Sequence, residues 1–303
     1  MTTYFTFIPT TRLGNWLFQY ATALARGGDV VGYMPAPSMR KLLDPYGDIF
    51  GKLRIVETLP EGVKTYCETL PNYQSIPHFE GDVCLKGYFQ CEKHFKGSAE
   101  KIRAAFAISP EREARLREKY GAWLSRPNVT GISVRRGDYL KLPHRYPVMN
   151  YGYFKRCFER LPEYDDFIVC SDDIPWCKKF FSKRFPNKRF CFSSNTTAMD
   201  DLYLQSLCQN NVISNSSFSW WGAWLNPNPK KRVLMPKTWY GPEYRHYGND
   251  GRDVGAEGWE KVENHQRPIE WVRGQVMANW QIFKRRFYPV KRFVTVNLLG
   301  GTH

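Results

Sequence analysis

The second half of the chain alternates strand-like and helix-like segments, and this alternation constrains the fold more than any other feature of the sequence. The strand-like segments share a high apolar content, and they are Val129–Val134, Phe167–Cys170, Arg189–Phe192, Val212–Ser214 and Val233–Met235. The helix-like segments that separate them are Tyr153–Arg160, Trp176–Phe185, Met199–Cys208 and Trp220–Leu225. Strands that alternate with helices across short turns form a parallel, doubly wound sheet. We therefore predict an α/β fold.

The first half of the chain predicts a second α/β unit. Its strand-like segments are Tyr4–Ile8, Val30–Tyr33, Leu53–Val56 and Val83–Phe89. Segment Asn15–Ala25 has apolar residues at helical spacing, and the charged stretch Ser98–Leu124 is helical with a break near Pro110, because proline interrupts a helix. A length of 303 residues suits two domains. We place them at residues 1–126 and 127–265, followed by a C-terminal piece at 266–303.

The charge of the chain predicts an anionic partner. Its formal net charge is +15, which suits a nucleic acid, a nucleotide-linked substrate or an acidic membrane surface. Aromatic residues make up 16% of the chain and suit flat or sugar-like ligands. A polyanion-binding protein, for example one that binds RNA, is the rival class. The sequence shows no recognisable nucleic-acid module, and the basic residues are dispersed except at the C-terminus, so we expect no nucleic-acid partner.

Cysteine spacing and the N-terminus bear on metal binding and location. None of the eight cysteines forms a C-x-x-C pair, so a zinc site is not expected. The N-terminus carries no basic residue before Arg12 and does not resemble a secretory signal. We therefore expect a cytoplasmic protein with reduced, mostly buried cysteines.

Two strand ends carry residues suited to phosphate binding. The first strand of the second half ends in Arg135, Arg136, Gly137 and Asp138. Arginine presents a rigid donor fork that matches phosphate oxygens. A solvated arginine pair, or a local ion pair between Arg136 and Asp138, is the alternative interpretation.

The second strand end is Ser214–Trp221, which opens a helix. Its hydroxyls and free backbone N–H groups would form an anion site at the helix N-terminus. The alternatives are simple capping by Ser217 or Ser219 and core positions for the tryptophans.

Two further segments offer polar groups near turns. Asp172 and Asp173 follow a strand, where a carboxylate can accept from a purine or a ribose hydroxyl. Taken alone, this segment is better interpreted as a helix N-cap. Before the first helix, Gly14 would allow close approach of the backbone to a ligand, and Asn15 would orient a hydroxyl. The alternative there is a turn followed by an asparagine N-cap.

Taken together, these segments resemble the inverting α-1,2-fucosyltransferases of glycosyltransferase family 11. The matching stretches are Arg12–Ala23, Gly87–Phe95, Gly131–Tyr139, Phe167–Cys177 and Asp200–Asn226. Their combination in this order is specific, although each is weak alone. The resemblance implies a GT-B-like fold, in which two Rossmann-like domains with parallel sheets face a cleft. It also implies GDP-fucose as donor, a β-galactoside oligosaccharide or lipid-linked glycan as acceptor, and no metal or other cofactor.

The resemblance also implies roles for residues. Arg135 would hold the donor β-phosphate, and Asp172 or Asp173 would read guanine. Asn15 would face the reacting centre, and Asp138 would be the catalytic base. The catalytic set is thus Arg135, Asp138 and Asn15. The donor-binding set is Arg12, Gly14, Ser133, Arg135, Arg136, Asp172, Asp173, Ser216, Ser217 and Phe218.

This chain departs from the family pattern at two positions, and it lacks a metal-binding motif of other glycosyltransferases. Ser133 stands where the family has histidine, and Trp16, which we expect beside the acceptor cleft, stands where it has glutamine. No D-x-D triplet occurs in the sequence, so Arg135 and a helix N-terminus would neutralise the leaving phosphate. Transfer of another GDP-deoxyhexose, such as colitose, by the same machinery stays open.

The C-terminal piece combines basic and aromatic residues. From Trp271 to His303 it contains six lysines and arginines and no acidic residue. We expect Trp271–Phe283 to pack on the first domain as a crossover helix, and Lys284–His303 to contact the inner membrane face.

Overall fold

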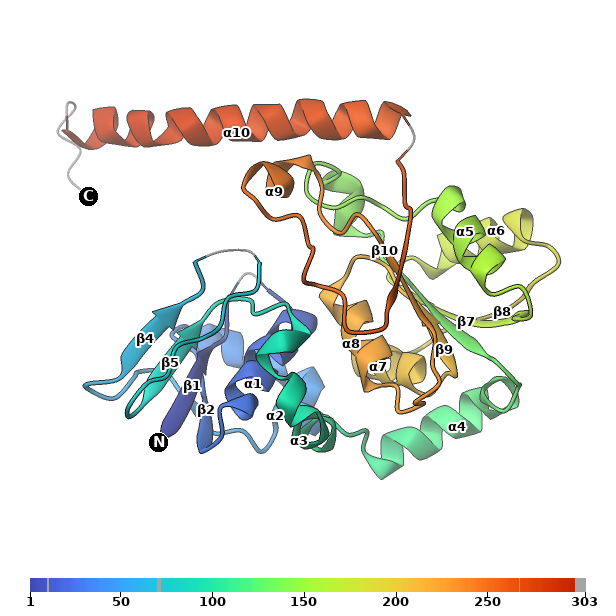
Figure 1. Ribbon diagram of the computed structural model, residues 1–303, viewed down its shortest axis with the longest axis horizontal. Coiled ribbons are helices and arrows are strands. Elements are labelled where there is room, and N and C mark those ends of the chain that lie inside the picture. Colours follow the sequence, from blue (N-terminus) through green and yellow to red (C-terminus); the bar gives the residue numbers. More distant parts are fainter. Residues whose placement is uncertain (10, 70–71, 267, 298–303) are drawn as a thin grey trace.

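The computed structural model describes residues 1–9, 11–69, 72–266 and 268–297, with side chains described as far as Arg285. These residues form two α/β domains that face a cleft, and helix α4 (Pro110–Leu124) connects them (Figure 1). The predicted GT-B-like arrangement of two Rossmann-like domains is therefore confirmed.

The first domain is built on a five-stranded sheet in which every strand pair is parallel. Its order is β3-β2-β1-β5-β4. The strands are β1 (Thr2–Thr6), β2 (Asp29–Tyr33), β3 (Ile55–Val56), β4 (Lys64–Cys67) and β5 (Val83–Lys86). The helices are α1 (Leu13–Ala25), α2 (Gly47–Phe50) and α3 (Ala99–Ala105), with a 3₁₀ segment at Pro37–Tyr46.

The second domain is built on a six-stranded parallel sheet of order β11-β10-β9-β6-β7-β8. The strands are β6 (Thr130–Val134), β7 (Asp166–Ser171), β8 (Arg189–Phe192), β9 (Asn210–Val212), β10 (Val233–Pro236) and β11 (Glu260–Val262). The helices are α5 (Tyr151–Arg160), α6 (Ile174–Arg184), α7 (Ala198–Ser206), α8 (Ser217–Leu225) and α9 (Pro242–His246). The predicted strand–helix alternation is confirmed.

Two strands were not predicted, and both lie at sheet edges. β4 has the sequence KTYC and β11 the sequence EKV, and each ends the strand order of its sheet. Edge strands tolerate charged residues because one side of the strand faces solvent, so their hydrophobic signal is weak. The predicted helix break is confirmed, because α4 begins at Pro110 and Ser109 caps it by accepting from the N–H of Arg112 at 3.3 Å.

Aromatic side chains join the two domains. The ring of Phe18 on α1 lies 4.6 Å from that of Trp220 and 5.1 Å from that of Trp221, both on α8. All three residues are fully buried. The alternative that assigned these tryptophans to the core is therefore correct, and their packing holds the N-termini of α1 and α8 beside each other at the cleft.

Helix α10 (Pro268–Asn297) lies along one edge of the molecule and contacts α9 (Figure 1). Because α9 belongs to the second domain, the expectation that Trp271–Phe283 packs on the first domain is wrong. Within the part of the chain that the structure describes, no helix is both long and apolar enough to cross a membrane. The basic tail that we expected at the membrane includes residues 298–303, which lie outside the described residues.

Candidate active site

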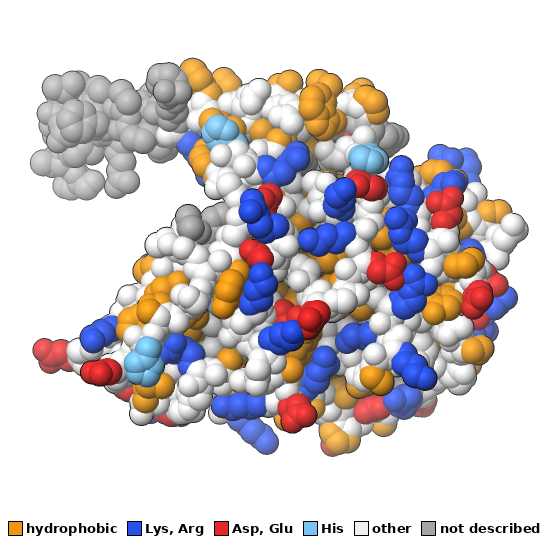
Figure 2. Space-filling view, viewed as in Figure 1, with side chains coloured by type: hydrophobic (Ala, Val, Ile, Leu, Met, Phe, Trp, Pro, Cys, Tyr) orange, Lys and Arg blue, Asp and Glu red, His pale blue; other side chains and the backbone are white. Residues whose placement is uncertain are grey.

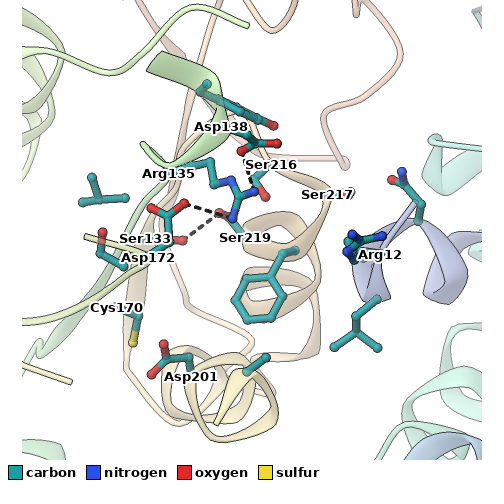
Figure 3. A pocket seen from close by; sticks show the side chains of 18 of the residues that line it. Arg12, Ser133, Arg135, Asp138, Cys170, Asp172, Asp201, Ser216, Ser217 and Ser219 are labelled. Atoms are coloured by element: carbon teal, nitrogen blue, oxygen red, sulfur yellow. Dashed lines mark hydrogen bonds and ion pairs between the residues drawn. The ribbon is translucent and has the colours of Figure 1, made fainter. Parts of the chain in front are cut away.

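A cavity of about 550 Å³ opens between the domains, at the carboxyl ends of β6 and β7 and the amino ends of α1 and α8 (Figure 3). We call it the first cavity. Ten of the twelve predicted site residues line it, and they are Arg12, Gly14, Asn15, Ser133, Arg135, Asp138, Asp172, Ser216, Ser217 and Phe218. Ligands bind at this edge of doubly wound sheets.

Two carboxylates fix Arg135 in the first cavity. Its guanidinium contacts Asp138 at 2.6 Å and Asp172 at 3.0 Å, as the dashed lines in Figure 3 show. The local ion pair considered from the sequence therefore forms, but with Arg135 rather than Arg136. Arginine has five N–H donors, so these two contacts leave donors for an anionic ligand. A Cβ at Gly137 would lie 2.5 Å from Oδ2 of Asp172, so any other residue here would displace this carboxylate from Arg135.

The N-termini of α1 and α8 meet at the first cavity. A Cβ at Gly14 would lie 2.4 Å from the backbone nitrogen of Phe218 and 2.7 Å from Oγ of Ser217. Only glycine therefore allows this approach. Unpaired N–H groups and the partial positive charge of a helix N-terminus attract anions, so the part of the cavity where the two ends meet suits an anionic ligand.

Ser133 belongs to a buried chain of hydroxyls. Its Oγ lies 2.7 Å from Oγ of Ser219, which lies 3.1 Å from Oγ of Ser214. These groups satisfy one another below the cavity surface, where the family has an imidazole in place of Ser133. The smaller side chain leaves room in the cavity at this position.

The structure does not bring Arg136 and Asp173 into the first cavity. Asp173 accepts from the N–H of Trp176 at 3.2 Å and so caps α6. Its other oxygen accepts from Nε of Arg136 at 3.0 Å, and the Arg136 guanidinium lies 3.7 Å from the centre of the Trp176 ring. Capping and stacking thus occupy both side chains.

Sequence reasoning missed Asp201, which lines the first cavity (Figure 3). Its carboxylate accepts from Oγ1 of Thr196 at 2.8 Å, and burial raises its pKa. No ion pair involves Asp201 among the described residues. The adjacent Asp200 pairs with Arg112 and completes the capping box of α7. The sequence signal for this role was the pair Asp200 and Asp201 at the start of α7. Capping the helix needs only one of the two acids, so the other is available for a ligand.

A second cavity of about 640 Å³ continues from the first. Asn15, Asp138, Tyr139, Tyr146, Ser217 and Thr11 line both. The rest of its wall is rich in aromatic side chains, which are Tyr88, Trp239, Tyr240, Tyr244 and Tyr247. Such rings present flat apolar faces together with hydroxyl groups, so this cavity suits an uncharged polar ligand such as a sugar.

Gln90 links the domains at the junction of the two cavities. Its amide donates to Oδ1 of Asn15 at 2.6 Å and accepts from the hydroxyl of Tyr240 at 2.5 Å. This bridge fixes the amide of Asn15 at the place where the cavities meet. The sequence stretch Gly87–Phe95 contains Gln90, but the sequence alone assigned it no role.

Glu68 and Asp138 are the two carboxylates that line the second cavity. Sequence reasoning missed Glu68. It accepts from the backbone N–H groups of Tyr88 at 2.7 Å and Phe89 at 3.2 Å. Burial raises the pKa of the Glu68 carboxyl, and these two hydrogen bonds lower it in part. A Cβ at Gly87 would lie 2.5 Å from that of Glu68, and Phe89 has a φ of 51°. The backbone turn therefore folds around this carboxylate.

The expected place of Trp16 beside the acceptor cleft is wrong. Trp16 is fully buried, and its ring packs edge-on against Phe7 at 5.8 Å and Phe50 at 6.4 Å. It points into the core of the first domain because it lies on the sheet-facing side of α1. The departure from the family pattern at this position therefore changes packing rather than the cavity wall.

The titratable side chains do not group as a metal centre. Among the residues that the structure describes, no three histidine, cysteine or acidic side chains lie close enough to hold one ion. All eight cysteines are free, and six are buried.

Comparisons with known proteins agree with this geometry. Residues 1–262 match the model of Glycosyl transferase family 11. The chain is 29% identical over 223 residues to the O-antigen biosynthesis glycosyltransferase WbnK of Escherichia coli, and the aligned region covers 70% of each protein. It is 31% identical over 196 residues to an α-1,2-colitosyltransferase of Escherichia coli, covering 61% of this chain and 64% of that protein.

Two further similarities involve proteins named as fucosyltransferases. Galactoside 2-α-L-fucosyltransferase Sec1 of Mus musculus is 27% identical over 276 residues, which cover 77% of this chain and 71% of that protein. Among solved structures, the NodZ α-1,6-fucosyltransferase soaked with GDP-fucose aligns with a TM-score of 0.48 at 15% identity, covering 83% of this chain and 97% of that one.

Proposed function

Because the chain belongs to glycosyltransferase family 11, we propose that it transfers L-fucose from GDP-fucose to the 2-hydroxyl of a terminal β-galactoside, with inversion at the anomeric carbon. The observation that supports this best is a pair of joined cavities that meet at Asn15, Asp138 and Ser217. The first contains Arg135 and two helix N-termini, and the second is rich in aromatic side chains. The product belongs to a surface polysaccharide, in line with the relative named for O-antigen biosynthesis.

The first cavity holds the nucleotide part of the donor in this proposal. The pyrophosphate lies between Arg135 and the N-termini of α1 and α8, where N–H donors converge. Asp201 reads guanine, because a carboxylate without a cationic partner can accept from the adjacent ring and amino N–H groups of that base. Asp172 is less suited to this role, because it already contacts Arg135 and accepts from the backbone N–H of Arg136.

The chemical step is a single displacement through an oxocarbenium-like transition state. The acceptor oxygen forms a bond to the anomeric carbon while the bond from that carbon to the β-phosphate oxygen breaks. The electron pair of the broken bond stays on the phosphate, so negative charge grows there. Arg135 and the two helix N-termini stabilise that charge, and the transfer needs no metal ion. The lack of a D-x-D triplet in the sequence supports this proposal.

The second cavity holds the acceptor. Aromatic faces cover the apolar side of a galactose ring, and the Asn15 amide, fixed by Gln90, orients the attacking hydroxyl beside the donor.

Glu68 takes the proton of the attacking hydroxyl in this proposal, in place of Asp138. Asp138 is bound to Arg135 at 2.6 Å, and a base held in an ion pair gives up its electron pair to a proton less readily. Glu68 has no cation partner among the described residues, and burial raises its pKa. A base with a raised pKa accepts a proton more effectively near neutral pH.

Transfer of colitose from GDP-colitose is the alternative, and one observation favours it. The relative named as an α-1,2-colitosyltransferase is 31% identical to this chain. The family match gives no such support to the RNA-binding alternative.

The donor is tested by incubating the protein with lactose and each of GDP-fucose, GDP-colitose, GDP-mannose and UDP-galactose, with product masses read by mass spectrometry. A mass increase of one deoxyhexose from GDP-fucose supports the proposal, and exclusive use of GDP-colitose establishes the alternative. Transfer from UDP-galactose alone would refute both.

A further inference from the structure

Helix α10 exposes a stripe of large apolar side chains on the side that faces away from the protein. The residues of this stripe recur every three or four positions, and they are Ile269, Val272, Val276, Trp280 and Phe283. Each is at least 51% exposed. At 3.6 residues per turn these positions fall on one face of the helix. Orange side chains mark this face along the outer edge of α10 in Figure 2.

The opposite face of α10 holds the helix against the second domain. Ala278 is buried, and a Cβ at the buried Gly274 would lie 3.3 Å from the carbonyl oxygen of Pro143. Arg285 pairs with the buried carboxylate of Glu243 at 3.0 Å. The helix is thus anchored by its small residues while its large apolar residues lie in solvent. A helix that only packed on its own domain would have the reverse arrangement.

The charge around the stripe selects an anionic surface as its partner. Arg273 and Lys284 flank the stripe and are exposed, and the Lys284 ammonium lies 5.0 Å from the centre of the Trp280 ring. From Trp271 onward the sequence has six basic and no acidic residues. A second copy of the helix would bring these like charges together, whereas an anionic bilayer neutralises them.

We propose that the outer face of α10 docks the protein on an anionic lipid bilayer, with the apolar stripe lying in the headgroup region. An amphipathic helix with aromatic and aliphatic residues on one face and basic residues beside them binds in this way. The surface is separate from both cavities, so docking leaves the transfer site open.

Docking also places the second cavity beside the bilayer. Arg285, on the anchored side of α10, lines that cavity. This step rests on the proposed function. The acceptor is then a glycan carried on a lipid, which would enter the second cavity from the membrane surface.

The test uses the full chain and sedimentation with vesicles of phosphatidylcholine alone or with 30% phosphatidylglycerol. Trp280→Gln removes a stripe residue that is 55% exposed, and Trp271→Gln removes an equally large residue that is 53% exposed but lies outside the stripe. We expect binding to the anionic vesicles that weakens with salt. We also expect Trp280→Gln to lower the bound fraction and its combination with Val276→Gln to lower it at least about tenfold, whereas Trp271→Gln leaves it nearly unchanged.

Three results would overturn the inference. They are no binding of the unaltered protein to anionic vesicles, equal losses in the two tryptophan variants, or a stable dimer in solution that the stripe variant dissociates. Transfer to soluble lactose is measured in parallel and should be unchanged in all variants. A protein that binds vesicles but transfers nothing would refute the proposed function and leave the docking surface intact.

Discussion

Replacing Glu68 by glutamine tests which of the two carboxylates that line the second cavity, Glu68 or Asp138, is the catalytic base. The substitution keeps the shape of the side chain but removes the ability to take a proton. Positioned general bases contribute about 10²- to 10⁴-fold to a rate. We therefore expect kcat to fall by about this factor, with a much smaller change in the KM for lactose.

The pH dependence distinguishes a base from a binding group. Burial raises the pKa of Glu68 above its usual value of 4.5, and the reaction needs the ionised form. Activity should therefore be low where Glu68 is protonated and should rise with pH through its raised pKa. Glu68→Gln should lose this acid limb altogether, whereas Asp138→Asn should keep it.

A loss of folding must be separated from a loss of catalysis. Oε2 of Glu68 accepts from the N–H groups of both Tyr88 and Phe89, so a glutamine whose carbonyl oxygen takes this place keeps both hydrogen bonds. A glutamine in the other orientation leaves an N–H unsatisfied, which costs about 1–3 kcal/mol. Thermal unfolding measures this cost directly. Glu57→Gln, at an exposed acid, is the matched control and should behave like the unaltered protein. An unchanged acid limb in folded Glu68→Gln would refute the assignment.

Three other predictions concern the donor. Arg135→Ala should lower kcat by about 10²- to 10³-fold in steady-state assays. Arg135→Lys should recover little of this loss, because a point charge cannot replace the donor fork of the guanidinium. Near-normal turnover of Arg135→Ala would contradict the role of Arg135 in stabilising the leaving phosphate. Asp201→Asn should weaken GDP binding by about 10- to 150-fold while leaving ADP binding unchanged in calorimetry, and equal losses for both nucleotides would count against guanine reading. EDTA should leave initial rates unchanged, and activity that returns only with added magnesium or manganese would contradict metal-independent transfer.

The regular parts of the fold were predictable from the sequence because their signals are local. Buried parallel strands such as β7 contain a continuous apolar run, here Phe167–Cys170, and Pro110 marks a helix start. β9 was placed two residues late, because it begins with Asn210 and Asn211. Their side chains are buried but satisfied, with the Asn211 amide donating to the carbonyl of Gln205 at 2.8 Å. A polar residue paired in this way is invisible to hydrophobic periodicity.

The site was only partly predictable, because neighbouring residues of one type take different roles. Arg135 and Arg136 are adjacent, yet one lies in the first cavity and the other stacks on Trp176. Asp172 and Asp173 divide in the same way between the cavity and a helix cap. Glu68 directly follows the edge strand β4 and is far in sequence from the motif that it contacts, so only tertiary structure brings it to the cavity.

The linkage of the product tests the central claim most directly. Lactose incubated with GDP-fucose and the full chain yields a trisaccharide whose NMR spectrum reports both the anomeric configuration and the substituted carbon. The proposed function predicts an α-anomeric fucose attached to O2 of galactose. A β-linked product, attachment to any other hydroxyl, or hydrolysis of GDP-fucose without transfer would contradict it.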